Sequence, residues 1–296
     1  MTADVGAVVR DTGRLRYRVG TAVVGLPVLL LAVWFGGLIL ASVAVVVAIL
    51  AAIELRRLLP GPGGPLLAIS VVGASVLIFT SAVGTPLWPH FATGSAAVGL
   101  LSWVTFHRGE RESMPTLSRV LKAIGPLYPA AFLGLGLGIH MLVFGPEIGA
   151  VDAGRNWLLF SLLLVFTSDT FAFFTGRAIG SRRLAPRISP RKTWEGAIGA
   201  LVGSASTSAV LSPLLPLQSD HLLGLTAAGE VMAFGVIGAG VSVLAQGGDL
   251  FVSALKRAGG SKDAGELLPG HGGVMDRLDS ILPVLPAVYY GLLWAS

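Results

Sequence analysis

The chain has 296 residues, of which 53% are hydrophobic and only 12% charged, and its mean hydropathy is +0.78. This composition excludes an ordinary water-soluble globular protein and predicts an integral membrane protein. The absence of cysteine excludes disulfides, thiolate nucleophiles and zinc–thiolate sites, so a metal would need oxygen or histidine ligands, and oxygen favours ions such as Mg²⁺.

Residues 1–18 are polar and carry four arginines, which indicates a cytosolic arm. We expect no cleavable signal peptide, because the apolar run that follows is too long for one. Residues 19–53 contain no charge. At about 1.5 Å per residue and a core about 30 Å thick, this run suits two short transmembrane helices. Gly36-Gly37 marks the expected turn between them, and Glu54 marks their end.

Seven more transmembrane spans are predicted from apolar runs separated by polar or glycine- and proline-rich segments. They cover approximately residues 65–83, 88–106, 120–143, 157–176, 194–216, 230–250 and 278–295. We therefore expect an all-α membrane protein with about nine transmembrane helices. Its predicted regions are an N-terminal arm (1–18), five N-terminal helices (19–155) and a catalytic region of four helices with two cytosolic loops (156–296).

The basic residues predict the orientation of these helices. With a cytosolic N-terminus, 20 of the 21 lysines and arginines lie on the cytosolic side, as the positive-inside rule requires. The net charge of +5 is then an orientation signal, and we do not expect a nucleic-acid partner. Four lysines against seventeen arginines indicate a GC-rich prokaryotic gene. We therefore expect a multi-pass protein of the prokaryotic plasma membrane, that is, of the cell inner membrane.

Two long cytosolic connections, after the sixth and eighth spans, hold most of the remaining polar residues, and we expect them to meet at one membrane face. Asp169 lies within the sixth span, just before the first connection. An acid in a transmembrane helix costs roughly 2.5–3.5 kcal/mol on insertion scales and usually faces a cavity or the protein interior. Asp169 is therefore a candidate site residue, with a structural hydrogen bond between helices as the alternative.

The first connection contains two candidate helix starts. Either Ser189-Pro190 begins a helix, or Thr193 caps the seventh span with Glu195 in its first turn. Next to such a start, Arg191 and Lys192 would form an anion site for a lipid or nucleotide phosphate. A solvated basic loop would look similar, but the polar residues among the bases favour a site.

The second connection lies in the segment 247–280, which holds nine charged residues and one histidine among 34 residues. Carboxylates bind cations, bases contact phosphate oxygens, and glycines allow backbone N–H groups to approach closely. The segment therefore predicts a site for a metal-bound polyphosphate. If the eighth span continues past Asp249 as a helix, Ser253 and then Lys256 or Arg257 lie on the same face.

The end of this segment combines a glycine run with two acids. The run Pro269-Gly270-His271-Gly272-Gly273 is predicted to form a backbone nest for phosphate oxygens. Asp276 and Asp279 follow at the start of the ninth span, where compensation of the helix dipole would explain one of them. Aspartates from different helix ends that face one pocket, such as Asp249 and Asp276, could bind a pair of cations.

A family resemblance follows from these residues. From Ser253 to Asp279 the chain reads S-x-L-K-R-x4-K-D-x-G-x2-L-P-x-H-G-G-V-x-D-R-L-D, which resembles the signature of the phosphatidate cytidylyltransferases, or CDP-diacylglycerol synthases. Ser168-Asp169-Thr170 and Ser189-Pro190-x-Lys192-Thr193-Trp194-Glu195-Gly196 are also similar to that family. The resemblance covers about residues 160–295, whereas the N-terminal spans agree only in hydropathy.

The resemblance implies transfer of a cytidylyl group from CTP to phosphatidic acid, with CDP-diacylglycerol and pyrophosphate as products. It implies Mg²⁺ as cofactor, alone or with a monovalent cation such as K⁺, and names Asp249 and Asp276 as the cation ligands. The other implied catalytic residues, which contact phosphate or nucleotide, are Lys256, Arg257, Lys262, His271 and Arg277. The implied substrate-binding residues are Asp169, Ser189, Arg191, Lys192, Thr193, Glu195, Ser253, Asp263, Gly272, Gly273 and Asp279.

Two departures and two alternative functions stand beside this interpretation. Val252 occupies a position where many family members have glutamate, and Arg191 one where many have lysine or glycine. A CTP-dependent transferase or kinase acting on another lipid, such as an ether-lipid phosphate or a polyprenol, would use the same cytosolic chemistry. A secondary transporter is disfavoured, because the acids cluster at one membrane face. Small residues in the spans allow close helix packing, and we expect a homodimer.

Overall fold

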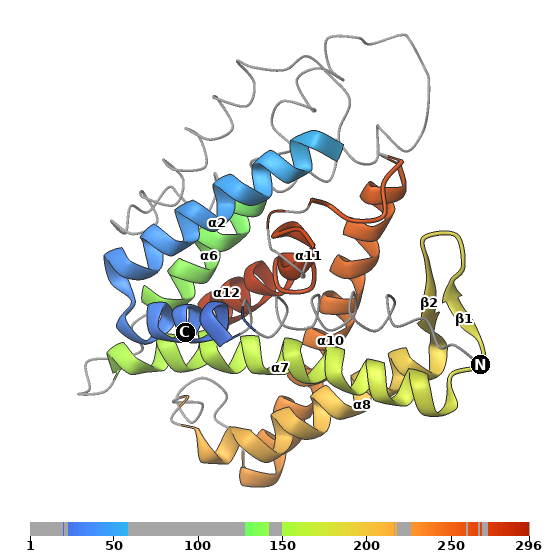
Figure 1. Ribbon diagram of the computed structural model, residues 1–296. Helices are drawn as coiled ribbons and strands as arrows, with labels where there is room; N and C mark the ends of the chain where they lie inside the picture. The colour runs from blue at the N-terminus through green and yellow to red at the C-terminus, as the bar shows by residue number, and fades with distance from the viewer. Residues whose placement is uncertain are drawn as a thin grey trace, which may run out of the picture.

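The computed structural model describes residues 20, 23–58, 128–141, 150–215, 217, 226–258, 260–265, 267 and 272–295. These residues are mainly helical, with one two-stranded antiparallel sheet among them (Figure 1). The predicted spans at 65–83 and 88–106 and the arm at 1–18 lie outside the described residues. The total of nine transmembrane helices therefore stays a prediction.

Within the described ranges, four helical stretches are long and apolar enough to cross a membrane: Gly37–Leu55, Ala153–Ile179, Trp194–Leu214 and Ala228–Arg257. Three shorter apolar helices cover Val23–Phe35, Tyr128–Met141 and Val284–Trp294. Each of these seven overlaps a span predicted from hydropathy. The described part of the chain thus has the helices of a multi-pass membrane protein.

The predicted turn near Gly36-Gly37 is confirmed. Helix Val23–Phe35 ends there and α2 (Gly37–Leu58) begins, with φ of +62° at Gly36 and +49° at Gly37. The ring of His140, from α6 (Tyr128–Met141), packs so closely on Gly36 that a Cβ there would clash with it. His140 Nε2 also lies 2.9 Å from the carbonyl oxygen of Val33. The helix break is therefore fixed both by backbone conformation and by a packed side chain.

Three long helices carry the polar connections. α7 (Ala150–Ile179) packs against α8 (Trp194–Leu211), which continues into the 3₁₀ turn η2 (Ser212–Leu214) and packs against α10 (Ala227–Ala258) (Figure 1). Buried hydroxyl groups link them: Ser168 bonds Ser242 at 2.8 Å, and Ser204 donates to Gly238 O at 2.8 Å. Such bonds between helices are a usual device in membrane proteins.

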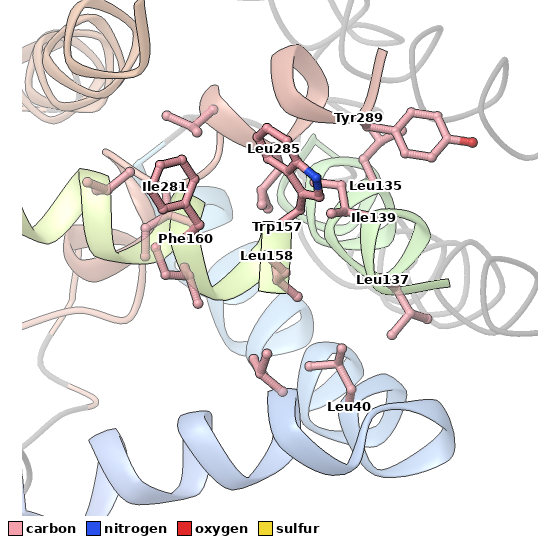
Figure 2. Close-up of a cluster of buried hydrophobic side chains, with 14 of the residues drawn as sticks. Leu40, Leu135, Leu137, Ile139, Trp157, Leu158, Phe160, Ile281, Leu285 and Tyr289 are labelled. Atoms are coloured by element: carbon pink, nitrogen blue, oxygen red, sulfur yellow. The ribbon is translucent and has the colours of Figure 1, made fainter. Parts of the chain in front are cut away.

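A buried apolar cluster joins the N-terminal and C-terminal halves (Figure 2). Trp157, from α7, stacks on Phe234 of α10 at 5.7 Å between ring centroids, and its Nε1 donates to Leu217 O at 3.0 Å. Side chains from α2, α6 and the C-terminal helix α12 (Val284–Ala295) complete the cluster, among them Leu40, Leu135, Ile139, Leu285 and Tyr289. The helices that bear the site are therefore anchored in one packed core.

The first polar connection is not helical, which corrects one of its two interpretations. β1 (Arg183–Ala185) and β2 (Ser189–Thr193) form an antiparallel hairpin in which Ser189 pairs with Ala185. Ser189-Pro190 therefore does not start a helix. Proline is tolerated in β2 because each strand of a two-stranded sheet has a free edge.

The alternative interpretation of this connection is confirmed. Thr193 is the N-cap of α8, with φ of −123° and ψ of 155°, and its hydroxyl accepts a bond from Gly196 N at 3.2 Å. Glu195 lies in the first turn of the helix, as predicted. The hairpin thus passes directly into α8, and Lys192 lies immediately before the N-cap of that helix.

The Gly36 turn gives a first test. We expect Gly36→Ala to lower the free energy of unfolding by about 1–3 kcal/mol, because alanine disfavours positive φ and its methyl group meets His140. Gly25→Ala is the matched control, since a Cβ there has open space. Thermal unfolding of both variants in detergent measures the difference. Equal melting temperatures would contradict this account of the turn.

Candidate active site

The two polar connections meet, as expected from the sequence. Lys192 of β2 reaches Asp249 of α10, with 2.6 Å between Nζ and Oδ2. In a second contact between the connections, Arg257 Nε donates to Ile188 O of the hairpin at 3.2 Å. Residues about sixty positions apart in the chain therefore share one site.

The eighth span does continue as a helix past Asp249, to Ala258. Ser253, one turn further along, donates its hydroxyl to Asp249 Oδ1 at 3.2 Å. Of the two bases beyond it, Lys256 points to Asp276, with 2.6 Å between Nζ and Oδ1. The face predicted for α10 is thus present, and it ends in a second lysine–aspartate pair.

Asp276 is held more tightly than Asp249. It lies in the short helix α11 (Met275–Leu278), and its Oδ2 accepts backbone N–H bonds from Ala264 and Gly273, both at 3.0 Å. Only 12% of its side chain is exposed, against 30% for Asp249. Asp276 therefore fixes the backbone around it as well as carrying charge.

Two further acids lie near these pairs. Asp279, in the turn after α11, is buried and accepts a bond from Ser280 N at 2.8 Å. Asp169 of α7 is exposed, with the Ser280 hydroxyl in hydrogen-bonding range. The charges of Asp249 and of a lysine act on each of these two carboxyl groups, Lys192 on Asp169 and Lys256 on Asp279. Three helices and the hairpin thus bring acids and lysines into one charged cluster.

The glycine run presents its backbone differently from the predicted phosphate nest. Gly272 has φ of +82°, but the N–H groups of Gly273, Val274 and Met275 are bonded to carboxylates of the protein. These three donors already have partners. His271 and residues 268–270 lie outside the described residues, so the rest of the nest stays a prediction.

The remaining candidates differ in exposure and contacts. Arg191, Lys262, Asp263 and Arg277 are exposed, and Arg257 Nη1 donates to Ser261 O at 3.3 Å. The Glu195 carboxylate accepts bonds from Ser181 Oγ at 2.7 Å and from the backbone N–H groups of Ser181 and Arg182. Glu195 therefore ties the start of the hairpin to α8, which is a structural role in this geometry.

Val252 does not face the charged cluster. It is fully buried in a second apolar cluster with Leu55, Tyr128, Leu255, Met275 and others from α2, α6, α10 and α11. An acid in the same environment would be buried among apolar side chains. This packing gives a physical reason for valine at position 252.

Sequence reasoning missed the contribution of Glu54, which we had used only to mark the end of the second span. The Glu54 side chain is fully buried and accepts N–H bonds from Val274 at 2.9 Å and Met275 at 2.8 Å. The cost of an acid in an apolar run, which singled out Asp169, applies equally here. The neighbouring arginines made Glu54 look like part of an orientation signal.

The two carboxylates predicted to bind Mg²⁺, those of Asp249 and Asp276, are of the ligand type that this ion prefers. No group of three or more histidine, cysteine or acidic side chains among the described residues is arranged as a metal site. Mg²⁺ is commonly bound by one or two carboxylates and completed by phosphate oxygens and water. Asp249 accepts two hydrogen bonds of the roughly four that a carboxylate can accept, so it has room for a metal.

Known proteins similar to this chain share one activity in their names. Residues 16–294 match the sequence model of the cytidylyltransferase family. Phosphatidate cytidylyltransferases are 41% identical over 138 residues in Haemophilus influenzae and 35% identical over 161 residues in Rickettsia typhi. That of Brucella abortus is 38% identical over 171 residues.

These relatives match only part of the chain. The matched stretches cover 46%, 54% and 57% of this chain, and the chain spans 46%, 67% and 57% of the respective relatives. The aligned stretches thus cover roughly half of this chain and about half to two thirds of each relative, whereas the family match extends over nearly all of this chain.

Two adjacent glycines test the packing of the site. A Cβ at Gly248 would clash with Asp279 O and lie 2.5 Å from Pro283 Cγ, whereas one at Gly247 meets nothing within 4 Å. We expect Gly248→Ala to cost about 1–3 kcal/mol of stability by overpacking, and Gly247→Ala to be neutral. Thermal unfolding compares the two variants. A stable Gly248→Ala protein would show that α10 and the 279–283 segment do not pack as described.

Proposed function

The chain belongs to the cytidylyltransferase family, and on that premise we propose that it transfers a cytidylyl group from CTP to phosphatidic acid. The products would be CDP-diacylglycerol and pyrophosphate. The observation that carries the proposal is the Lys192–Asp249 contact, which joins the two polar connections in one charged cluster. The names of the relatives supply the substrate class.

The proposed cation ligands are Asp249 and Asp276. Mg²⁺ held there would neutralise charge on the CTP phosphates; a second, monovalent cation such as K⁺ is part of the same proposal. Each aspartate is paired with a lysine in the structure, Asp249 with Lys192 and Asp276 with Lys256. With cations on the two carboxylates, the ammonium groups of Lys192 and Lys256 would be available to phosphate oxygens.

The chain would bring two anions together and needs no covalent intermediate. A phosphate oxygen of phosphatidic acid is already a nucleophile, and in-line attack on the α-phosphorus of CTP breaks the bond to the departing pyrophosphate. Lys192 and Lys256 are paired with the proposed cation ligands and, together with Arg257 further along α10, would stabilise charge on the transferring and departing groups. Arg277, Lys262 and His271 are proposed further contacts.

The position of the cluster suits a lipid substrate. Asp249 lies towards one end of α10, one of the helices long enough to cross a membrane, so a lipid phosphate at the membrane surface could reach it. We propose that this end faces the cytosol, where CTP is found, in a prokaryotic plasma membrane. A homodimer remains part of this proposal.

Substituting the proposed cation ligands tests the function. We expect Asp249→Asn and Asp276→Asn to abolish formation of CDP-lipid and pyrophosphate from labelled CTP, Mg²⁺ and phosphatidic acid in detergent. An amide is a weak Mg²⁺ ligand and carries no charge. Glu230→Gln is the control on the same helix, because Glu230 lies in the first turn of α10, far from Asp249. Substantial turnover by either asparagine variant would contradict the assignment.

The same assay separates the alternatives. Product with a polyprenol but not with phosphatidic acid would assign the chain to another lipid substrate. No product with any lipid, from folded wild-type protein, would contradict a transferase function.

A further inference from the structure

Glu54 connects the N-terminal half of the chain to the candidate site. It lies near the C-terminal end of α2, and its side chain is fully buried. Its two oxygens are used separately, Oε1 by Val274 N at 2.9 Å and Oε2 by Met275 N at 2.8 Å. The bonded N–H groups belong to the residues immediately before Asp276.

The backbone around Glu54 is shaped to admit its carboxylate. A Cβ at Gly265 would lie 2.7 Å from Oε1, and one at Gly273 would lie 2.5 Å from Oε2. Both residues are glycine, so the 265 and 273 backbones can close on the carboxylate from two sides. Any larger residue at either position would have to displace it.

Asp276 binds the same two backbone segments from the other side. Its Oδ2 accepts N–H bonds from Ala264 and Gly273, which are adjacent to the residues that contact Glu54. Asp276 therefore joins the 264 and 273 backbones, and Glu54 bonds residues 274 and 275 and packs closely on Gly265. The direction of Asp276 Oδ1, which is paired with Lys256, therefore depends on this backbone.

Burying the Glu54 side chain costs free energy, because its neighbours are mainly apolar. Its neighbours in the second apolar cluster include Leu55, Val274 and Met275. Replacing buried charged groups by apolar ones of similar volume often stabilises a protein. A fully buried carboxylate with two short N–H bonds is therefore better explained by the geometry it imposes than by stability.

We infer that Glu54 is a positioning residue for Asp276, acting through the 273–275 backbone. The expected effect on catalysis rests on the proposed function, whereas the expected effect on the 273–275 backbone does not. Through Glu54, helix α2 contributes to a site whose other residues come from the C-terminal half of the chain.

Glu54→Gln is the primary test, with Leu55→Ala as the matched control. An amide supplies only one acceptor oxygen and turns an N–H donor towards one of the two backbone donors. Leu55 is a buried neighbour in the same cluster, so its truncation disturbs packing and leaves the Glu54 bonds intact. Two readouts are compared in full-length protein in detergent: amide hydrogen exchange of residues 272–279 and CDP-lipid synthesis across a Mg²⁺ titration.

We expect Glu54→Gln to speed exchange at 273–275, to raise the half-saturating Mg²⁺ concentration and to lower kcat about 100-fold, since a displacement of about 1 Å can have that effect. The KM for phosphatidic acid should not change. Leu55→Ala should lower the melting temperature without changing exchange at 273–275 or the Mg²⁺ dependence. If both variants lose activity only in proportion to stability, with the same Mg²⁺ dependence, Glu54 is merely structural and the inference is wrong.

A double-mutant cycle with Gly265 checks the mechanism. Gly265→Ala should displace the carboxylate and reproduce the slow turnover, but in a Glu54→Ala background its methyl group meets no carboxylate. The loss in the double variant should therefore be smaller than the product of the single losses. Independent, multiplicative effects would overturn the inference. Wild-type protein without any CDP-lipid synthesis would overturn the proposed function, while the exchange measurement would still decide the role of Glu54.

Discussion

The ion pair between Lys192 and Asp249 is the contact on which the candidate site depends, because it joins two polar segments that the chain separates by an entire helical hairpin. β2 delivers the lysine and α10 delivers the aspartate, and α8 runs between them in the chain. The hairpin is kept in place by Glu195, which binds its first residues, and by Arg257, which binds Ile188. Without these contacts the basic connection would be an ordinary loop.

Two acids of the site are each paired with a lysine. Lys192 pairs with Asp249 and Lys256 pairs with Asp276, and the charge of Asp249 also acts on the nearby carboxyl groups of Asp169 and Asp279. In the proposed reaction, the Lys192–Asp249 and Lys256–Asp276 pairs would be exchanged for contacts with metal ions and phosphate oxygens.

Several parts of the fold and site followed from the sequence because they depend on local chemistry. Gly36-Gly37 predicted the break between the first two helices, and Thr193 with Glu195 predicted the start of α8. The spacing of Asp249, Ser253 and Lys256 placed them on one face of α10. The hairpin was missed, because Ser189-Pro190 satisfies the local rules for a helix start as well as those for an edge strand.

The sequence by itself determined the membrane character, the two polar connections and the residues that could bind metal and phosphate, since hydropathy and residue type are carried by each position. Only the tertiary structure decided which charges pair, because Lys192 with Asp249 and Lys256 with Asp276 are choices among several bases and acids. It alone also showed that Glu54 is buried against Val274 and Met275. Glu54 and these two residues are about 220 positions apart in the chain. No local sequence pattern encodes a contact between segments that are so far apart.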